Sequence, residues 1–466
     1  MTGPARVVVV GGGLAGMAAA VALESAGARV TLLESRRFLG GRAGSFEDPQ
    51  TGELLDNCQH VLLGCCTNLI DFYKRIGALH LIRFDRTIHF RDERGRRHDL
   101  SGVRGLPAPL HLSSSLARFS ALTVSERASL IRAMVAMMAT DARQRDVLAD
   151  VPFGDWLDRH RQPESLVRKF YDVLVISGLN ERTRDVSAAY ALQLFQESLL
   201  ANAQGYVVGV PNCPLSQLYA SVPLRDLRLG ARAGEVQIFK GRVTGVTFGD
   251  EAVPADAVVV ATNHHALDRL VPHEWSARDN RFASLDQLQS VPILGAHLWF
   301  DRPVLREPHA ALIGGPLQWV FARDQRGSAL HGVISAAREW IDRPRDEMLS
   351  MFEEQVRNTF SEAREAKLLR GNIVVEKRAT FSPLPGVERF RPAQAPPRDG
   401  IQGLYLAGDY THTGWPATME GAVRSGYLAA EALLAEFAPE LPVHKRTFLA
   451  EDLPIQWPAR LLGYSR

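Results

Sequence analysis

The residues with the most reactive side chains gather in one short segment, which reads DNCQHVLLGCCTN at positions 56–68. It holds one histidine, His60, and three of the chain's four cysteines, Cys58, Cys65 and Cys66. A histidine can hold or release a proton near neutral pH. A cysteine can act as a nucleophile, a redox group or a metal ligand, or pack as a small apolar side chain. The segment alone is compatible with all of these functions. Which one applies depends on the helices and strands that position it.

Metal binding and disulfide formation are the weaker interpretations of this segment. Zinc sites usually use two separated pairs of ligands, and the only cysteine outside the segment is Cys213. A disulfide between the adjacent Cys65 and Cys66 would be strained. We therefore predict no metal site and expect these two cysteines to pack. Cys58 and His60 are two residues apart, so on a strand they would face the same side, and they are the predicted catalytic residues.

The chain begins with the pattern of a dinucleotide-binding unit. Residues 6–10 are predicted to form a buried parallel strand, residues 17–26 a helix and residues 28–34 a second strand. Glu34 closes the second strand, where its carboxylate can bind the hydroxyl groups of a ribose and would repel the 2′-phosphate of NADP. The pattern therefore predicts a βαβ unit that binds a nucleotide without that phosphate.

Three glycines connect the first strand to the helix as Gly11-x-Gly13-x-x-Gly16. The first allows a tight turn, the second lets the backbone approach a pyrophosphate, and the third lets the helix pack closely on the strand. The pyrophosphate is then expected at the positive end of the helix, beside Leu14 and Ala15.

A second glycine motif follows the second strand closely, at Gly40, Gly41 and Arg42. A glycine pair followed by an arginine resembles the second fingerprint of the flavin amine oxidase and carotenoid desaturase superfamily, which indicates FAD rather than NAD. In that superfamily the arginine meets the pyrophosphate. The residue types suit this role, because glycine permits close backbone approach and a guanidinium group binds phosphate well.

The far end of the chain carries another signature that resembles the same superfamily. Residues 403–409 read GLYLAGD, a strand that runs into a Gly-Asp turn, and residues 414–434 follow with a helical pattern. In the superfamily's C-terminal motif the turn holds the ribityl chain and a helix N-terminus faces the flavin ring, where its dipole would stabilise the anionic reduced form. The resemblance assigns these roles to Gly408, Asp409, Thr418, Met419 and Ala422.

These signatures predict an α/β fold, with a Rossmann-type FAD-binding domain of the GR2-like flavin amine oxidase kind and an interleaved α+β substrate domain. We expect helices at residues 125–145 and 164–176 and a strand at residues 291–300. The FAD domain is expected at residues 1–75, 205–265 and 395–440, the substrate domain at 76–204 and 266–394, and a C-terminal extension at 441–466. The resemblance also places the backbone near Ala233 against the adenine.

The reactive segment and the C-terminal motif together resemble the hydroxysqualene dehydroxylase family, squalene-associated FAD-dependent desaturase-like enzymes of bacterial hopanoid pathways. The resemblance covers essentially the whole chain. It implies non-covalent FAD, an isoprenoid substrate and the reductive dehydroxylation of hydroxysqualene to squalene. In plant-type phytoene desaturases the same run looks like Gly-x-His, and here Cys58 replaces that glycine. The predicted FAD contacts are Gly11, Gly13, Leu14, Ala15, Gly16, Glu34, Ser35, Gly40, Gly41, Arg42, Gln59, His60, Ala233, Gly408, Asp409, Thr418, Met419 and Ala422.

Other functions remain open at this stage. The first alternative is a carotenoid or polyprenoid desaturase, followed by an amine or protoporphyrinogen oxidase and by a prenyl-lipid binding protein without flavin chemistry. Thr418 falls where many amine oxidases carry one wall of an aromatic cage, which argues against an amine substrate. Trp415 either walls the pocket or packs. We expect His264 and His265 in a loop and His297 in the core. With only one dinucleotide fingerprint, the sequence identifies no electron donor.

Composition limits the partners. The chain has 466 residues, 46% hydrophobic, and a formal net charge of +2, which gives no general attraction to nucleic acid. Its cysteine usage favours a reducing cytoplasm. A squalene-sized product must leave into lipid, so we predict peripheral attachment to the inner face of the cytoplasmic membrane, without a spanning helix. The predicted contacts are the helix around residues 130–138 or the C-terminal segment with Trp457, Leu461, Leu462 and Tyr464.

Overall fold

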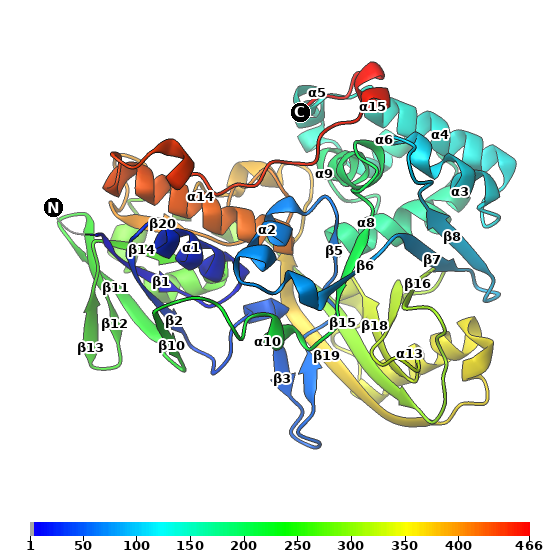
Figure 1. Ribbon diagram of the computed structural model, residues 1–466, viewed down its shortest axis with the longest axis horizontal. Helices are drawn as coiled ribbons and strands as arrows, with labels where there is room; N and C mark the ends of the chain where they lie inside the picture. Colours follow the sequence, from blue (N-terminus) through cyan, green and yellow to red (C-terminus); the bar gives the residue numbers. More distant parts are fainter. Residues whose placement is uncertain (1–3) are drawn as a thin grey trace.

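The computed structural model describes residues 4–466 and shows three connected parts (Figure 1). A parallel sheet with α1 and α14 lies at one end, a group of helices that includes α4 and α9 lies at the other, and a second large sheet with α13 lies below these helices. The C-terminal segment crosses from α14 to the helical part, which joins the two ends of the molecule.

Five strands form the parallel sheet, in the order β10-β2-β1-β14-β20. They come from three separate stretches of sequence: β1 Arg6–Val10, β2 Arg29–Glu34, β10 Asp226–Leu229, β14 Ala257–Val260 and β20 Leu404–Leu406. The apolar residues of β1 and β14 are buried, as expected for central parallel strands. The predicted βαβ unit is confirmed, with α1 at Leu14–Ser25.

Helix α14 (Met419–Phe437) packs directly on α1. The contact is close because Gly426 has no side chain: a Cβ there would lie 2.2 Å from the carbonyl oxygen of Ala15. The last flavin-like motif is thus fixed against the first. An antiparallel meander of three strands connects β10 to β14: β11 Ala233–Phe239, β12 Arg242–Phe248 and β13 Glu251–Pro254.

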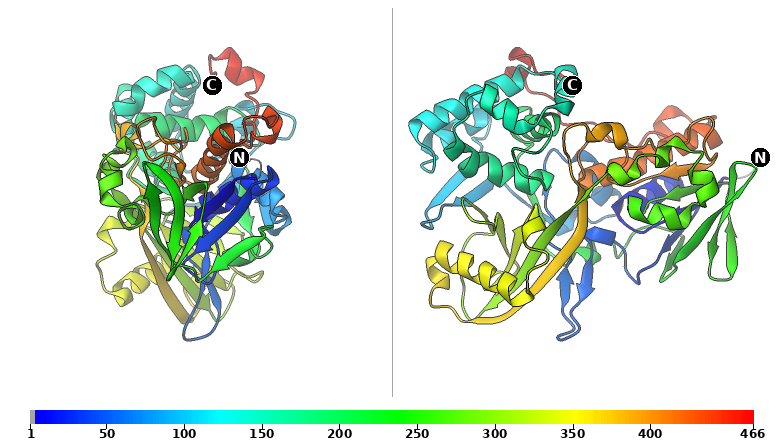
Figure 2. Two further views of the ribbon diagram at one scale, coloured as in Figure 1. Left: turned by 90° about the vertical axis from the view of Figure 1, so that its left-hand side faces the viewer. Right: turned by 180° about the vertical axis from the view of Figure 1, so that it is seen from behind.

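The second large sheet has seven strands, in the order β19-β15-β18-β17-β16-β7-β8. Both predicted halves of the substrate domain contribute to it: β7 Thr87–Arg91, β8 Arg97–Ser101, β15 Ser290–Phe300, β16 His309–Leu312, β17 Trp319–Ala322, β18 Ala329–Ile334 and β19 Leu368–Phe381. Helix α13 (Arg345–Thr359) packs on it around an apolar core of its own. Figure 2 shows β19 as a long curved strand that reaches back toward the parallel sheet.

The helical part differs from the prediction in two places. The helix predicted at 125–145 is two helices, α4 (Val124–Met138) and α5 (Ala142–Val147), because Asp141 caps a new helix with Gln144 in a capping box. The helix predicted at 164–176 continues to residue 179 through α7 Glu164–Leu166, the π-helical turn η5 Val167–Tyr171 and α8 Asp172–Leu179. The remaining helices here are α3 Ser113–Arg118, α6 Phe153–Arg159, α9 Ala188–Phe195 and the π-helical turn η6 Gln196–Leu200.

The reactive segment lies between a hairpin and a short helix. The hairpin is β3 (Ser45–Glu47) and β4 (Leu54–Asp56), and β5 (Leu62–Leu63) follows it. Strand β5 joins β9 (Val208–Pro211) and β6 (Ile82–Asp85) in one sheet, so this sheet crosses the predicted domain boundary. The remaining short helices are α2 Thr67–Arg75, α10 Leu215–Leu218, α11 Leu267–Leu270, α12 His273–Ser276 and α15 Trp457–Leu461.

The N-terminal cap of α2 comes from another element. Asn68 and Asp71, the polar residues near its start, lie inside the helix, and neither side chain caps its N-terminus. The buried carboxylate of Glu420 does so from α14, accepting hydrogen bonds from the backbone N–H groups of Asn68 and Leu69 at 3.2 and 2.8 Å. The cap is therefore a tertiary contact between the reactive segment and the C-terminal motif.

The predicted membrane contacts are only partly exposed. Helix α4 buries Leu130, Ala133 and Met137 in the core and leaves Ile131 and Val135 exposed. In the C-terminal segment three of the four named residues are exposed, whereas Tyr464 is 1% exposed and anchors the segment. Among the helices at residues 4–466, none is both long enough and apolar enough to span a membrane.

Candidate active site

A cavity of about 820 Å³ connects the carboxyl end of β1 to the helical part of the molecule. Its lining contains Cys58, His60 and every predicted FAD contact except Gly16. Gly16 lies behind the loop instead, where a Cβ would come 1.9 Å from the carbonyl oxygen of Gly11. Its predicted contact with the cofactor stays a prediction, while its predicted role in close helix packing fits the structure.

The glycine loop after β1 leaves room for a ligand at one position. Gly11 has a φ of 110°, and a Cβ there would lie 2.7 Å from the carbonyl oxygen of Ala261, so only glycine fits without strain. A Cβ on Gly13 would meet no atom within 4 Å, and this residue lines the cavity. The open space lies at the N-terminus of α1, and the positive end of a helix can stabilise a pyrophosphate group.

The second glycine motif packs against the first. The backbone N–H of Gly40 donates to the carbonyl oxygen of Gly12 at 2.9 Å, and a Cβ on Gly41 would lie 3.2 Å from the Cα of Gly13. Two loops of the backbone thus form one wall of the cavity, as a pyrophosphate site requires.

Glu34 is held in place at the end of β2. Its Oε2 accepts a hydrogen bond from the N–H of Gly12 and its Oε1 accepts one from the N–H of Arg36, both at 2.7 Å. The side chain is 7% exposed and lines the cavity with Ser35 and Ala233. Oε1 also accepts a hydrogen bond from the hydroxyl group of Ser35 at 3.1 Å. Oε2 keeps a lone pair, so the group can still accept a hydrogen bond from a ribose.

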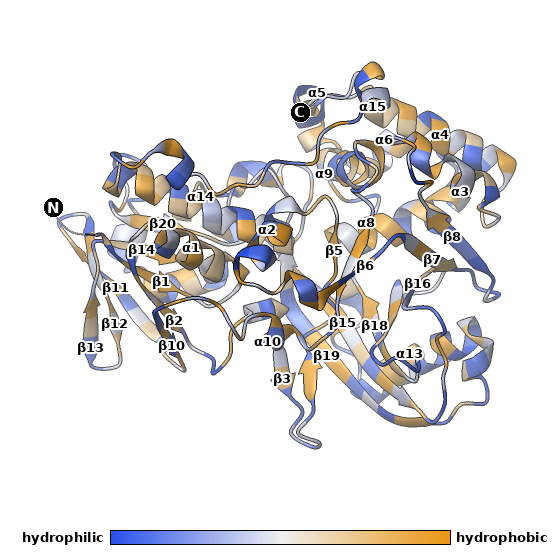
Figure 3. Cartoon of the chain, viewed as in Figure 1, coloured by the Kyte–Doolittle hydropathy of each residue, from blue (hydrophilic) through white to orange (hydrophobic). Residues whose placement is uncertain are grey.

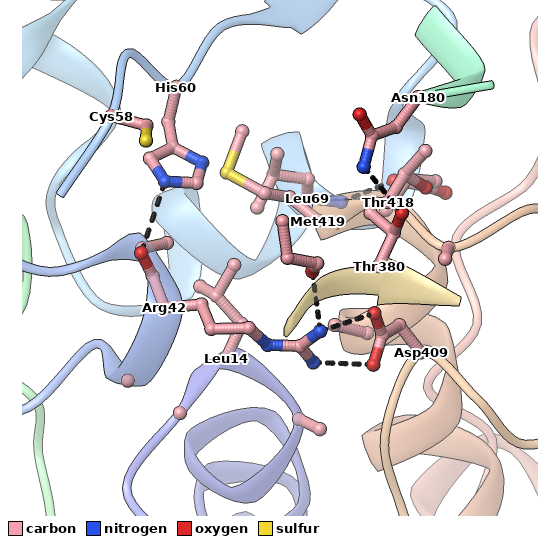
Figure 4. Close-up of a pocket in the computed structure, with 18 of the residues that line it drawn as sticks. Leu14, Arg42, Cys58, His60, Leu69, Asn180, Thr380, Asp409, Thr418 and Met419 are labelled. Atoms are coloured by element: carbon pink, nitrogen blue, oxygen red, sulfur yellow. Dashed lines mark hydrogen bonds and ion pairs between the residues drawn. The ribbon is translucent and has the colours of Figure 1, made fainter. Parts of the chain in front are cut away.

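Arg42 and Asp409 lie against each other, although they come from opposite ends of the chain. Nη2 of Arg42 is 2.5 Å from Oδ1 of Asp409, and Nη1 is 2.9 Å from Oδ2 (Figure 4). Nη1 also donates to the carbonyl oxygen of Ala379 at 2.7 Å. Sequence reasoning assigned these residues to different parts of the cofactor, and the structure brings them together as a bidentate ion pair at the cavity.

The N-terminus of α14 faces the same cavity. Thr418 caps it, because its Oγ1 accepts a hydrogen bond from the N–H of Gly421 at 3.1 Å. Met419 and Ala422 line the cavity beside it. The preceding Gly408 is fixed by its N–H, which donates to Oγ of Ser425 at 2.8 Å. A helix N-terminus at this place can stabilise negative charge on a bound ring system.

Cys58 and His60 both line the cavity, but not as neighbours on a strand. Strand β4 ends at Asp56, and Cys58 has a φ of 62°, in the left-handed region. The strand prediction is therefore wrong at this point: the chain turns at Cys58, a conformation that favours glycine. Cys58 is 4% exposed, and burial with the nearby carboxylate of Glu376 raises the pKa of its thiol to about 12. The thiol stays protonated.

The ring of His60 is held by two carbonyl groups. Its Nε2 lies 3.1 Å from the oxygen of Arg42 and 3.0 Å from the oxygen of Asn57. Both partners are acceptors, so Nε2 carries a hydrogen and Nδ1 is left for chemistry. Burial lowers the pKa of His60 from its ordinary value of 6.5, so its protonated form is a stronger acid than free imidazole. Figure 4 shows the ring beside Met419, across the pocket from Asn180.

The other cysteines are free thiols. Cys65 is buried, Cys66 is partly buried, and both line the cavity, so they shape its wall. Cys66 also packs against the core of the parallel-sheet domain. Within residues 4–466 no cluster of three or more potential ligands is placed to hold a metal ion.

Four other residues were considered for the site from the sequence, and only one of them, Trp415, lines the cavity. His297 is 2% exposed and its Nε2 contacts the carbonyl oxygen of Asp56 at 3.1 Å, so it is a core residue. His264 and His265 lie at a short 3₁₀ turn after β14, as expected, and neither is part of the cavity wall in the described structure.

Sequence reasoning missed the apolar half of the cavity. Its apolar residues come from α8, α9, η6 and β17 and are Leu174, Leu194, Phe195, Leu199, Trp319 and Phe321. Figure 3 shows α8 as a strongly hydrophobic element. These residue types are those of any buried core, and only the fold brings the four elements to one place. The same helices add the polar residues Ser177, Gln193, Glu197 and Ser198 to the wall. Gln59 adds a polar atom, since its buried Oε1 has no hydrogen-bond partner in the structure as described and can bind a ligand.

Comparison with known proteins agrees with this geometry. Residues 14–434 match the family of flavin containing amine oxidoreductases. A hydroxysqualene dehydroxylase from Sinorhizobium fredii is 29% identical over 454 residues, covering 93% of this chain and 99% of the relative. A 15-cis-phytoene desaturase from Synechococcus elongatus is 27% identical over 463 residues, covering 92% and 96%. Among solved structures, an oxidoreductase from Methanosarcina mazei superposes with a TM-score of 0.68 at 18% identity, covering 90% of this chain and 98% of that one.

Proposed function

Because the chain belongs to the family of flavin containing amine oxidoreductases, we propose that it uses FAD to replace the hydroxyl group of hydroxysqualene with hydrogen, which gives squalene. FAD and oxidoreductase chemistry come with the family. The substrate and the direction of the reaction are the proposed part.

One observation favours hydroxysqualene as the substrate. The imidazole of His60, with one nitrogen free to bind a ligand, lines a cavity that also has a largely apolar part. A long isoprenoid chain can be buried against Leu174, Phe195 and Phe321, where apolar contact stabilises it. His60 can then contact a hydroxyl group on that chain. A pure hydrocarbon would present nothing to this imidazole.

The reaction adds a proton to the hydroxyl oxygen and a hydride to the carbon that carries it. The C–O bond breaks, and the products are the hydrocarbon and water. FAD, when bound in its reduced state, would supply the hydride. The protonated ring of His60 passes the proton from Nδ1 to the hydroxyl oxygen, which leaves as water. The apolar wall excludes bulk water from the carbon that loses the hydroxyl group.

The residues that would hold FAD are those of the two glycine loops, Glu34 and the Arg42–Asp409 pair. The open space at Gly13 fits a pyrophosphate, Glu34 fits a ribose, and the N-terminus of α14 fits the electron-rich ring. No residue of this set forms an evident covalent link, so FAD is proposed to be non-covalent.

A desaturase is the second candidate, because phytoene desaturases resemble this chain about as closely as the dehydroxylase does. The test is anaerobic incubation of dithionite-reduced, FAD-loaded protein with hydroxysqualene, beside oxidised protein with phytoene and a quinone acceptor, followed by product analysis. Squalene from the first mixture supports the proposal. New conjugated double bonds in the second mixture, without squalene in the first, would identify a desaturase.

A further inference from the structure

A second cavity, of about 510 Å³, lies beside the C-terminal helix α15 and the loop that follows β8. Its lining includes Arg86, Arg104 and His111, and the described lining contains no carboxylate. Both arginines are exposed, and neither forms an ion pair within residues 4–466. Nη2 of Arg86 donates to Oε1 of Gln204, which also lines the cavity, at 2.7 Å. The cavity is therefore positively charged without internal compensation.

His111 gives this cavity an unused polar group. The side chain is 1% exposed, and neither ring nitrogen has a hydrogen-bond partner within the described part of the chain. A buried polar atom without a partner is unfavourable, and a ligand that hydrogen-bonds to it removes this cost. Gln456 adds a donor: its Oε1 accepts from the N–H groups of Ala108 and Ala203, at 2.5 and 3.1 Å, which leaves its amide N–H₂ for a ligand. Two guanidinium groups, an imidazole and an amide suit an anionic oxygen group such as phosphate.

The rim of the cavity is apolar and exposed. Val103 and Leu106 are each 41% exposed, and Trp457 is 60% exposed. Leu461, 77% exposed, lies one helical turn after Trp457 on α15. Exposed tryptophan and leucine beside arginine are typical of a surface that enters the headgroup region of a bilayer.

One residue connects this cavity with the candidate active site. Tyr206 lines both cavities, and its ring lies against that of His111 with centroids 5.3 Å apart. Its hydroxyl group is fixed between two backbone groups, accepting from the N–H of Gly102 at 2.7 Å and donating to the carbonyl oxygen of Arg86 at 2.8 Å. A ligand in the second cavity thus sits directly behind a wall of the first.

We propose that the second cavity binds the phosphate group of an anionic phospholipid while Trp457 and Leu461 insert into the bilayer, which places the membrane next to Tyr206 at the active-site cavity. The benefit of this membrane binding rests on the proposed function. If the substrate is an isoprenoid dissolved in the bilayer, it would enter the cavity directly from the membrane. The binding itself does not depend on the substrate.

The test is sedimentation of the FAD-loaded, full-length protein with vesicles of phosphatidylglycerol, at low and physiological salt, without any substrate. The double variant Arg86→Gln/Arg104→Gln should bind these vesicles about thirtyfold more weakly, since each arginine near an anionic surface contributes about 1 kcal/mol. The matched control is Arg94→Gln/Arg398→Gln, which removes two exposed arginines that do not line the cavity. It should bind like the wild type.

A second pair of variants tests the rim. Trp457→Ala should weaken vesicle binding about tenfold or more, whereas Phe239→Ala, which truncates an aromatic residue 65% exposed on β11, should not. Equal binding by the wild type and by the double arginine variant would overturn the proposal. So would tight binding of inorganic phosphate by a wild type that ignores the vesicles, which would indicate a free phosphate compound as the ligand. Neither result bears on whether hydroxysqualene is the substrate, because no turnover is measured.

Discussion

The tautomer of His60 determines what this residue can do. The carbonyl groups of Arg42 and Asn57 keep a hydrogen on Nε2, so Nδ1 accepts a hydrogen bond in the neutral ring and donates one only when the ring is protonated. Burial lowers the pKa of His60, so the protonated ring is scarce at neutral pH and increases as the pH falls below 6.5. If the ring supplies the proton, the reaction must follow that increase.

We therefore expect the rate of single-turnover dehydroxylation to rise as the pH falls, with an apparent pKa below the ordinary 6.5 of histidine. His60→Ala should keep FAD, lose about 10²–10⁴-fold in rate and lose this pH dependence. Anaerobic reoxidation of the reduced flavin by hydroxysqualene, followed at several pH values, measures the rate and its pH dependence. His265→Ala is the control, because His265 is exposed and lies outside the cavity wall. A His60→Ala protein with the wild-type rate would remove His60 from the reaction.

Cys58 offers a test of backbone strain. A side chain at φ 62° costs about 1–2 kcal/mol, and glycine avoids this cost. Cys58→Ala and Cys58→Gly both remove the sulfur, but only the glycine variant relieves the backbone. We expect Cys58→Gly to be the more stable of the two by about 1 kcal/mol, measured as the free energy of urea unfolding of the FAD-loaded protein. The opposite order would show that the left-handed conformation is not strained here.

The residue types of the site could be predicted from sequence more readily than their geometry. Glu34, Arg42 and the motif glycines follow patterns whose chemistry requires those residues, and all of them except Gly16 line the cavity. The left-handed turn at Cys58 could not be predicted, because a cysteine gives no sign of a positive φ. The Arg42–Asp409 pair joins residues far apart in the chain, and neither motif alone contains it.

Among the elements, α2 depends on α14 for its N-terminal cap. The carboxylate of Glu420, 0% exposed, accepts from the backbone N–H groups of Asn68 and Leu69 and from the side-chain amide of Asn68 at 2.9 Å. All three partners are donors, which an ionised carboxylate satisfies and an amide does not. The reactive segment that precedes α2 is thereby held to the helix whose N-terminus lines the cavity.

We expect Glu420→Gln to lower the free energy of unfolding by about 1–3 kcal/mol, because its amide N–H₂ would face a donor. Hydrogen exchange localises the effect: the amides of Asn68 and Leu69 should exchange faster, while those of β1 should not. Glu440→Gln, on the exposed segment after α14, is the control with the same change of charge. Unchanged protection at both amides would mean that the cap contributes nothing to α2.

Elements defined by local patterns were predicted with nearly correct bounds. Strand β1, helix α1 and strand β15 each follow from an apolar pattern of the right period. The break between α4 and α5 was missed because the apolar pattern continues across it, although Asp141 and Gln144 form a capping box that marks the new start. The cap of α2 was missed because Glu420 lies on another element.

At the scale of the molecule, the chain is interleaved. The parallel sheet takes strands from three stretches, and the seven-stranded sheet takes strands from both sides of the middle stretch. The motifs at the two ends allowed this interleaving to be predicted, since both were expected to contact one cofactor. The path of residues 441–466 could not be predicted, because this segment has no motif and its position depends on contacts with the helical part.

These contacts tie the C-terminal segment to a wall of the active-site cavity. The hydroxyl group of Tyr464 donates to Oε1 of Glu197 at 2.6 Å, Arg466 pairs with the same carboxylate, and the N–H of Gln456 donates to the carbonyl oxygen of Ala201 at 2.8 Å. Glu197 is 7% exposed and lines that cavity. The segment therefore stabilises η6, which carries part of the apolar lining.

Tyr464→Phe should lower the free energy of unfolding by about 1.5–3 kcal/mol, because it removes a hydrogen bond to a buried carboxylate. Deletion of residues 454–466 should have a larger effect and make the helical part sensitive to protease, while FAD stays bound, since its proposed contacts lie on other elements. Leu461→Ala is the control in the same segment: Leu461 is 77% exposed, so its loss should leave stability unchanged even where vesicle binding weakens. Thermal unfolding, limited proteolysis and the flavin absorbance of the purified variants measure these effects. If the deletion left the helical part as resistant to protease as the wild type, the segment would not support the cavity wall, and only its exposed face would remain to explain its position.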